Sequence, residues 1–111
     1  GGGRDMKKRK RMGLIAVNHS SFSVFTSDNP RDENPEKIIE DMISGIDTIQ
    51  LKKVFIELDR EIAIKLALSM IDEKCIVLIA GKGHENYQII KSKKIEFNDS
   101  HVVKKSLKIA V

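Results

Sequence analysis

Apolar and polar residues follow one another along the chain in patterns that predict strands and helices in turn. Residues 22–26 alternate and carry β-forming side chains, and residues 53–58 form a second strand-like stretch. Residues 75–80 are apolar without interruption, which is typical of a strand covered on both faces of a parallel sheet. The pattern therefore predicts three strands, with the third entirely inside the protein.

Helices are predicted between these strands. A short helix fits residues 11–19, with Leu14, Ile15 and Val17 available for burial. Asn34 can cap a second helix because Pro35 suits the first helical position, and Asp59 can cap a third. Apolar side chains at helical spacing predict the buried faces of these two helices: Ile38, Ile39, Met42, Ile43 and Ile46 in the second, and Ile62, Ala63, Leu66, Ala67 and Met70 in the third.

The last quarter of the chain predicts a hairpin and a final helix. Residues 87–90 and 95–97 flank a polar turn at residues 91–94. Asn98 and Asp99 can cap the helix that follows, whose inward positions would be Val102, Val103, Leu107 and Ala110. Strands that alternate with helices predict an α/β fold, a mainly parallel sheet flanked by helices, in one domain over residues 1–111.

Composition narrows the class of protein. Apolar residues make up 41% and charged residues 32% of the 111 residues, as in folded soluble proteins. The longest apolar run, residues 75–80, is too short to cross a bilayer. The lone cysteine, Cys75, excludes an internal disulfide, and its place in the apolar run predicts a buried, unreactive thiol. These features predict a cytoplasmic protein without membrane association.

Positive charge is concentrated at the beginning of the chain. The net charge is +4, residues 1–12 carry +5, and the remainder carries −1. A basic segment of this kind can bind nucleic acid, bind a phosphorylated small molecule, or be solvated. Its basic residues are Arg4, Lys7, Lys8, Arg9, Lys10 and Arg11.

A first candidate site follows the first predicted strand, in residues 27–31, here called the DNPR loop. Pro30 restricts its own φ angle and holds Asn29 in an extended conformation, which stiffens the loop. Asp28 and Asn29 offer side-chain oxygens, and Arg31 offers a planar fork of donors that suits a carboxylate. Donors and acceptors this close together suit a zwitterion such as an amino acid, although a plain strand-to-helix turn would have the same residues.

A second candidate site follows the third predicted strand, in residues 81–85, here called the GKGHE loop. It is not a phosphate-binding P-loop, because no Ser or Thr follows Lys82 and the glycine spacing differs. Taken alone, it could equally connect two elements or bind a ligand. His84 could act as a general base or simply order the loop through a hydrogen bond. Both loops are expected at the carboxyl edge of a parallel sheet, where ligands bind in open α/β folds.

These motifs together resemble the Mur ligase family, at the C-terminal domain of those members that add a diamino acid to UDP-MurNAc-L-Ala-D-Glu in peptidoglycan synthesis. The resemblance covers almost the whole chain, and the DNPR and GKGHE loops at this spacing are its most specific parts. It implies a Rossmann-like domain that lacks the family's first strand, as if the chain began within a loop. The other matching positions are residues 1–5, Lys8–Arg9, Met12–Gly13, Glu33, Pro35, Ile38–Ile39, Asp41, Gly45, Asp59–Arg60, Ala63–Ile64, Tyr87–Gln88, Phe97 and Asp99.

The resemblance implies a substrate, a set of binding residues and several partners. The substrate would be meso-diaminopimelate, whose distal carboxylate an arginine in this loop pairs with; lysine or ornithine is the alternative. ATP and Mg²⁺ would bind mainly outside these residues, as would the UDP-MurNAc-dipeptide, so the chain alone would contain no catalytic residue and be inactive. We expect a monomer, no resident metal and no nucleic acid, although a small basic nucleic-acid-binding module is the competing class. The diamino acid would contact Arg4, Asp28, Asn29, Pro30, Arg31, Gly81 and Glu85, with Lys82 and His84 as accessory residues.

Overall fold

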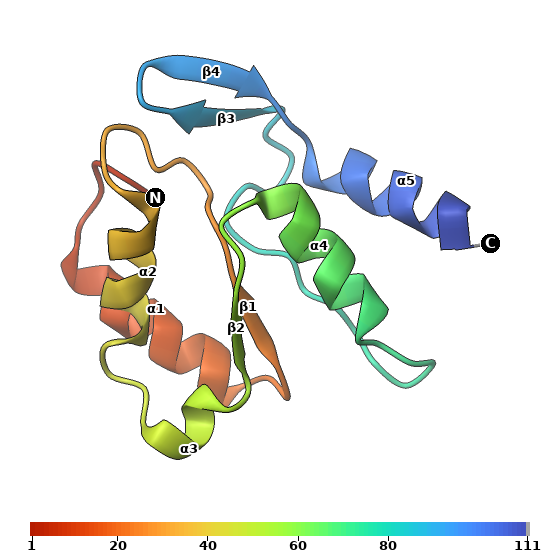
Figure 1. Ribbon diagram of the computed structural model, residues 1–111, viewed down its shortest axis with the longest axis horizontal. Helices are drawn as coiled ribbons and strands as arrows, with labels where there is room; N and C mark the ends of the chain where they lie inside the picture. Colours follow the sequence, from red (N-terminus) through yellow and green to blue (C-terminus); the bar gives the residue numbers. More distant parts are fainter. Residues whose placement is uncertain (111) are drawn as a thin grey trace.

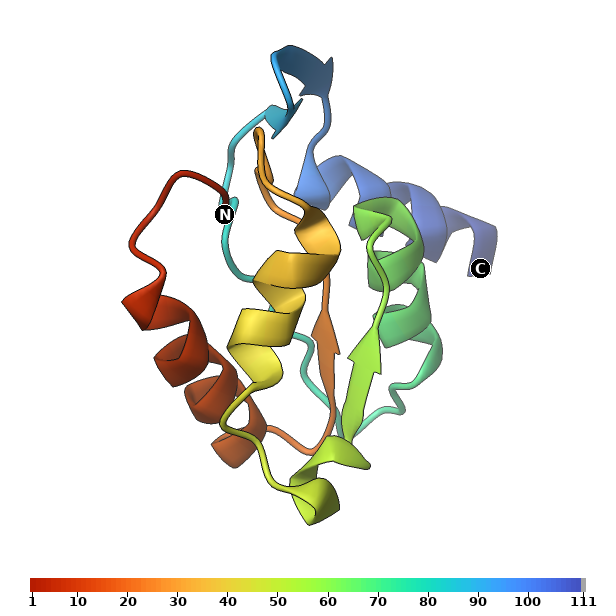
Figure 2. The ribbon, with the colours of Figure 1, turned by 60° about the vertical axis from the view of Figure 1, so that its left-hand side comes forward.

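Helices lie on both sides of a short parallel sheet. The computed structural model describes the backbone of residues 1–110 and the side chains of residues 1–107. Figure 2 shows α1 (Lys7–Asn18) and α2 (Pro35–Ile43) on one side of the two strands, with α4 (Arg60–Ser69) and α5 (Asp99–Ala110) on the other. The α/β class with flanking helices, predicted from the sequence, is confirmed.

The sheet pairs β1 (Ser23–Phe25) with β2 (Val54–Ile56) in parallel, with Val24 opposite Phe55. Its inner face packs on α1 and α2 through a core of Val17, Phe25, Ile39 and Ile46. Burial of these apolar side chains stabilises the packing of α1 and α2 on the sheet. Both strands run upward in Figure 1; the segment after β1 continues to the hairpin at the top, whereas the segment after β2 turns into α4.

Helix starts agree with the predicted caps. The Asn34 side chain accepts a hydrogen bond from the backbone N–H of Glu36, and Asp59 accepts one from Ile62. The sequence patterns missed a four-residue helix, α3 (Thr48–Leu51), which Asp47 caps in the same way. It was missed because none of its residues is buried, so it has no apolar stripe.

The predicted hairpin forms from β3 (Tyr87–Ile90) and β4 (Lys93–Glu96), which pair in antiparallel fashion. The hairpin stands apart from the main sheet at the top of Figure 1 and leads into α5. One parallel bridge, between Arg31 and Ile90, joins β3 to the DNPR loop. Val102 is buried, Leu107 is exposed, and Ala110 lies outside the residues whose side chains are described.

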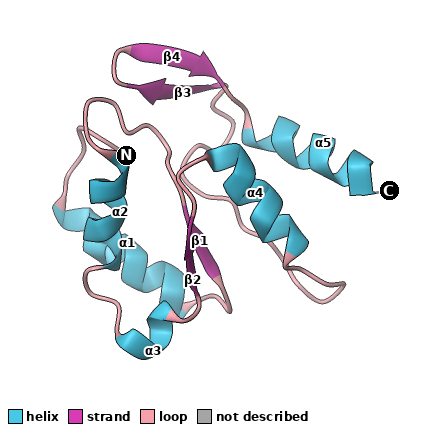
Figure 3. Ribbon diagram, viewed as in Figure 1, coloured by secondary structure: helices cyan, strands magenta, loops and turns pink. Residues whose placement is uncertain are grey.

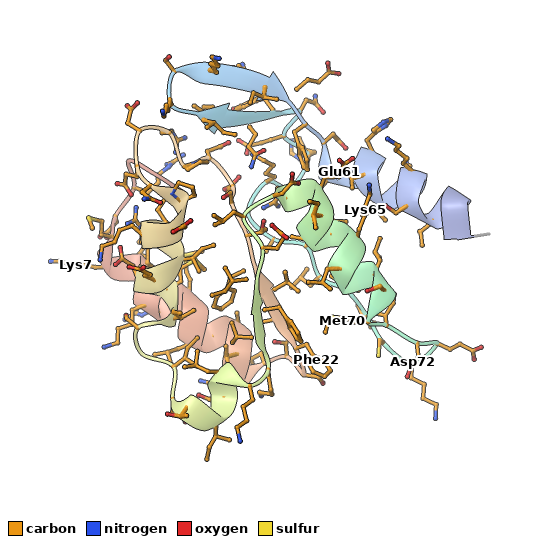
Figure 4. The ribbon with its side chains drawn as sticks, in the orientation of Figure 1. Lys7, Phe22, Glu61, Lys65, Met70 and Asp72 are labelled. Atoms are coloured by element: carbon orange, nitrogen blue, oxygen red, sulfur yellow. The ribbon has the colours of Figure 1, made fainter. Side chains whose placement is uncertain are left out.

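The third predicted strand is wrong. Residues 75–80 belong to no strand and are drawn as loop in Figure 3, and Ile76 and Leu78 are 95% and 87% exposed. Cys75 is exposed too, so it is not a buried core thiol; its Sγ lies 3.3 Å from Asp72 Oδ1, in the turn after α4 that Figure 4 labels. An apolar run becomes a strand only beside a hydrogen-bonding neighbour, and the described residues place none there.

Two of the predicted buried faces are rotated. Ile15 and Ile62 are 53% and 50% exposed, contrary to expectation. In α1, which begins at Lys7, the packed positions are Arg9, Gly13 and Val17. Gly13 explains the rotation, because a Cβ there would lie 1.9 Å from the Met42 carbonyl oxygen; only glycine lets α1 approach α2 so closely.

Candidate functional site

The two predicted loops meet around one lysine. The Lys82 side chain is fully buried, and its Nζ lies 2.9 Å from Asn29 Oδ1 and 2.9 Å from Asp28 Oδ1. The contact with Asn29 is a hydrogen bond, whereas Asp28 Oδ1 makes an ionic contact without hydrogen-bonding geometry. The GKGHE loop thus places its only lysine against the DNPR loop, 53 residues earlier in the chain.

Asn29 has an internal role. It is buried, and its Oδ1 accepts hydrogen bonds both from Lys82 and from the backbone N–H of Ile89, each at 2.9 Å. These bonds join the DNPR loop to the GKGHE loop and to the hairpin. The geometry gives Asn29 the part of a connector between three segments, beside the ligand contact that the resemblance implies.

Arg31 has a left-handed backbone, with φ of 54°. This conformation is unfavourable for a residue with a Cβ, and two backbone hydrogen bonds hold it: Arg31 N–H to Ile89 O at 3.0 Å and Lys91 N–H to Arg31 O at 2.6 Å. The Arg31 guanidinium donates from Nη1 to the Gly2 carbonyl at 2.6 Å and is partly exposed. The hairpin therefore fixes the direction in which the fork leaves the loop.

The opening glycines lie against the DNPR loop. Gly2 donates its N–H to the Asn29 carbonyl at 2.7 Å, and a Cβ at Gly2 would lie 1.9 Å from the Pro30 carbonyl oxygen. Glycine is required here because no side chain fits. Pro30 is buried beneath this contact, and Arg4 is exposed beside the same loop. Arg4 and Arg31 thus bring two guanidinium groups to one edge of the site.

The GKGHE loop adds a carboxylate and a tight turn. Glu85 Oε1 lies 3.9 Å from Lys82 Nζ, and the Tyr87 hydroxyl donates to Glu85 Oε2 at 3.4 Å. Gly81 has φ of 110°, and a Cβ there would lie 3.4 Å from Asp28 Oδ2. His84 is exposed and makes no side-chain hydrogen bond among the described residues, so the loop-ordering bond considered above is not observed.

A second buried ion pair, Arg60–Asp99, holds the backbone at the start of both loops. Arg60 donates to both carboxylate oxygens of Asp99, at 2.7 and 2.8 Å. Its remaining donors reach the carbonyl of Ser27, the first residue of the DNPR loop, and that of Ala80, just before the GKGHE loop, each at 3.1 Å. The sequence marked Arg60 only as a matching position, because no local pattern indicates that an arginine at a helix start is buried.

One of the six basic residues in the basic segment is not available to a ligand. Arg9 is buried and pairs with both Glu33 and Asp41, while its five other basic residues are exposed. The hydrogen bond from Arg9 holds the pKa of Glu33 below its ordinary value, and the Gly3 N–H adds to the effect. Arg9 therefore ties α1 to α2 and to the start of the chain.

The arrangement suits a zwitterion better than a nucleotide. The DNPR and GKGHE loops carry two half-buried carboxylates, Asp28 and Glu85, and one partly exposed guanidinium, Arg31, so together they offer partners for ammonium groups and for carboxylates. Lys82 is buried and already engaged with oxygens of its own chain, so its ammonium group is not presented to a phosphate. Among the described residues, no group of three His, Cys, Asp or Glu side chains could hold a metal ion, and no helix is long and apolar enough to cross a membrane.

Comparisons with known proteins agree on one family. The family described as Mur ligase, glutamate ligase domain, matches residues 1–83. The UDP-N-acetylmuramoyl-L-alanyl-D-glutamate--2,6-diaminopimelate ligase of Aquifex aeolicus (strain VF5) is 53% identical over 96% of this chain and 22% of that protein. The enzyme of the same name from Chlamydia abortus (strain DSM 27085 / S26/3) is 51% identical over 93% of this chain and 20% of that protein.

A solved structure is also similar. A structure of a UDP-N-acetylmuramoyl-L-alanyl-D-glutamate--2,6-diaminopimelate ligase superimposes with a TM-score of 0.91 at 39% sequence identity, over 99% of this chain and 22% of that one. The chain therefore spans about a fifth of the length of the proteins it matches.

Proposed function

The chain belongs to the Mur ligase, glutamate ligase domain family, and from that premise we propose that residues 1–111 form the C-terminal, amino-acid-binding domain of a longer ligase. That ligase would use ATP to join meso-diaminopimelate to UDP-MurNAc-L-Ala-D-Glu during peptidoglycan synthesis. Relatives named for this reaction match nearly the whole chain at 43–53% identity in only about a fifth of their own length. The domain is thus one part of the enzyme.

One observation supports this function most strongly: the DNPR and GKGHE loops, which meet at Lys82, carry two partly exposed carboxylates and a partly exposed guanidinium. Diaminopimelate carries two ammonium and two carboxylate groups, so it offers partners both to the carboxylates and to the guanidinium group of the site. Arg31 would pair with the distal carboxylate through its fork. Asp28 and Glu85 would accept hydrogen bonds from an ammonium group, with Arg4, Asn29, Pro30 and Gly81 completing the site.

The part of this domain in the reaction is to bind and orient. ATP and Mg²⁺ would bind mainly elsewhere in the longer protein. The chain's own residues would fix the diamino acid so that its amine points toward the carboxylate with which it forms an amide. Holding two reactants in position removes much of the entropic cost of their encounter. Lys82 and His84 would act only as accessory residues.

Selection of diaminopimelate over lysine or ornithine would depend on Arg31. A substrate without the distal carboxylate would leave the guanidinium partly desolvated without a partner, which disfavours binding. The guanidinium is oriented by the carbonyl oxygens of Gly2, at 2.6 Å, and Asn29, at 3.4 Å, which both accept hydrogen bonds from its Nη1. We further propose that the protein acts on these small molecules as a cytoplasmic monomer, and that nucleic acid is not its ligand.

The proposed function is tested with the full-length protein by measuring phosphate release. Turnover that requires ATP, UDP-MurNAc-L-Ala-D-Glu and meso-diaminopimelate together supports it, and clear preference for lysine or ornithine contradicts the substrate. The isolated residues 1–111 should give no turnover, and turnover by them alone contradicts the assignment as one part of the enzyme. Anisotropy with short DNA duplexes checks the nucleic-acid class: binding of one site more than ~10³-fold above random DNA would favour that class instead.

A further inference from the structure

Lys82 is the one lysine that the two loops enclose, and its contacts point to a role beyond packing. Its side chain is 0% exposed, whereas those of its ionic partners Asp28 and Glu85 are 28% and 37% exposed. The ammonium group therefore cannot touch a ligand, while both carboxylates can. Lys82 reaches the ligand only through them.

Geometry links the three charges closely. One nitrogen lies 2.9 Å from Asp28 Oδ1 and 3.9 Å from Glu85 Oε1, and Asn29 Oδ1 fixes it from a third direction at 2.9 Å. The Tyr87 ring centroid lies 6.0 Å away and closes a further side. Two carboxylates this close repel each other unless a cation lies between them.

Charge counting explains what such a group can do. Asp28 and Glu85 carry two negative charges and Lys82 carries one positive charge, so these three side chains together have one net negative charge. A single substrate ammonium group would balance it. The oxygens that remain free for that group belong to carboxylates whose positions Lys82 determines.

We propose that Lys82 is a positioning residue for the diamino acid: its buried ammonium group keeps the carboxylates of Asp28 and Glu85 together, so that they bind one ammonium group of the substrate. This inference rests on the proposed function and assigns a specific task within it. Lys82 itself makes no contact with the substrate.

The test is Lys82→Met in the full-length protein, with kcat and the three KM values measured separately. Methionine keeps most of the volume and removes the charge. We expect KM for meso-diaminopimelate to rise about tenfold to 100-fold, because the carboxylates separate, with the KM values for ATP and the UDP-MurNAc-dipeptide within about twofold of the unchanged protein. A diaminopimelate KM that stays the same or falls would overturn the proposal, as would an equal rise in all three.

Lys65→Met is the matched control. Lys65 is exposed on α4 (Figure 4) and has no ion pair among the described residues, so the same chemical change there should leave all three KM values unchanged. If Lys65→Met raises the diaminopimelate KM as much as Lys82→Met does, the effect comes from overall charge, and the proposal is overturned.

Asp28→Asn and the double variant Asp28→Asn/Lys82→Met keep the test decisive if the single lysine variant does not fold. With one carboxylate removed, Lys82 has less repulsion to offset. The double variant should therefore have a diaminopimelate KM within about twofold of Asp28→Asn alone. Effects that multiply would overturn the proposal. Wild-type turnover is measured first: its absence contradicts the proposed function, whereas turnover with independent effects contradicts only the role of Lys82.

Discussion

Arg60 and Lys82 are both buried cations paired with carboxylates, and they differ in how far those carboxylates are exposed to solvent. The Arg60–Asp99 pair is closed on both sides, with side chains 3% and 7% exposed. Lys82 is equally buried, but its partners Asp28 and Glu85 reach solvent. Arg60 binds only its own chain, whereas Lys82 lies directly behind a surface that a ligand can reach.

This difference in exposure assigns Arg60 to the stability of the fold and Lys82 to substrate binding. Arg60 uses its donors on Asp99 and on the carbonyls of Ser27 and Ala80, which fixes the ends of two segments and leaves nothing for a ligand. Removal of Arg60 should therefore lower the free energy of unfolding, whereas removal of Lys82 should weaken substrate binding. The variants below test whether the closed ion pair serves stability and the partly exposed cluster serves binding.

Arg60→Met should have the largest effect. Asp99 would be left as a buried charge without a partner, and two carbonyls would lose donors, so the free energy of unfolding should fall by about 3–5 kcal/mol. Urea denaturation followed by circular dichroism measures this. The double variant Arg60→Met/Asp99→Leu removes both charges and should recover most of the loss; a double variant as unstable as Arg60→Met would show that the ion pair is not the cause.

Arg31→Ala should come next and should affect activity, with stability nearly unchanged. Loss of a bidentate contact with the distal carboxylate should cost about 2–4 kcal/mol, roughly 30- to 1000-fold in kcat/KM for meso-diaminopimelate. Lysine, which lacks that carboxylate, should lose much less. Arg31→Lys should restore only part of the activity because an ammonium group cannot reproduce the fork. Equal, small losses for both substrates would indicate a solvated turn arginine.

Gly81→Ala should raise the diaminopimelate KM by a smaller factor, about fivefold to tenfold. The new Cβ would be strained at φ of 110°, and it would lie in van der Waals contact with Asp28 Oδ2, 3.4 Å away, so relief of the strain would shift Asp28. Gly83→Ala is a matched control, because Gly83 also has positive φ, at 57°, but a Cβ there meets nothing within 4 Å. If both variants raise KM equally, backbone strain is responsible and the contact with Asp28 is not.

Glu33→Gln should have the smallest effect, and it extends the comparison to a third buried cation, Arg9. The hydrogen bond from Arg9 lowers the pKa of Glu33, so its contribution to stability is full above the ordinary carboxyl pKa and is lost as pH falls through the lowered value. The variant should be slightly less stable than the unchanged protein at pH 7. The difference should vanish in acid, as thermal melts across pH would show; a gap that widens in acid would contradict this.

The sequence by itself determined the features that depend on near neighbours. Asn34 and Asp59 cap their helices because each side chain accepts a hydrogen bond from a backbone N–H two or three residues later. Likewise, the DNPR and GKGHE loops were found from their own residues and from the resemblance they carry. The alternation in residues 22–26 and the strand-like stretch at residues 53–58 also sufficed to place β1 and β2.

Only the tertiary structure decided which polar residues are buried and which apolar ones are not. Arg60 meets Asp99 across 39 residues, and Lys82 meets Asn29 across 53, so no local pattern could predict either contact. Residues 75–80 read as an interior strand because hydrophobicity records a tendency to be buried, whereas pairing depends on a neighbouring backbone. Ile15 lost its expected burial for the same reason: the approach of α2 to Gly13 determined which face of α1 is packed.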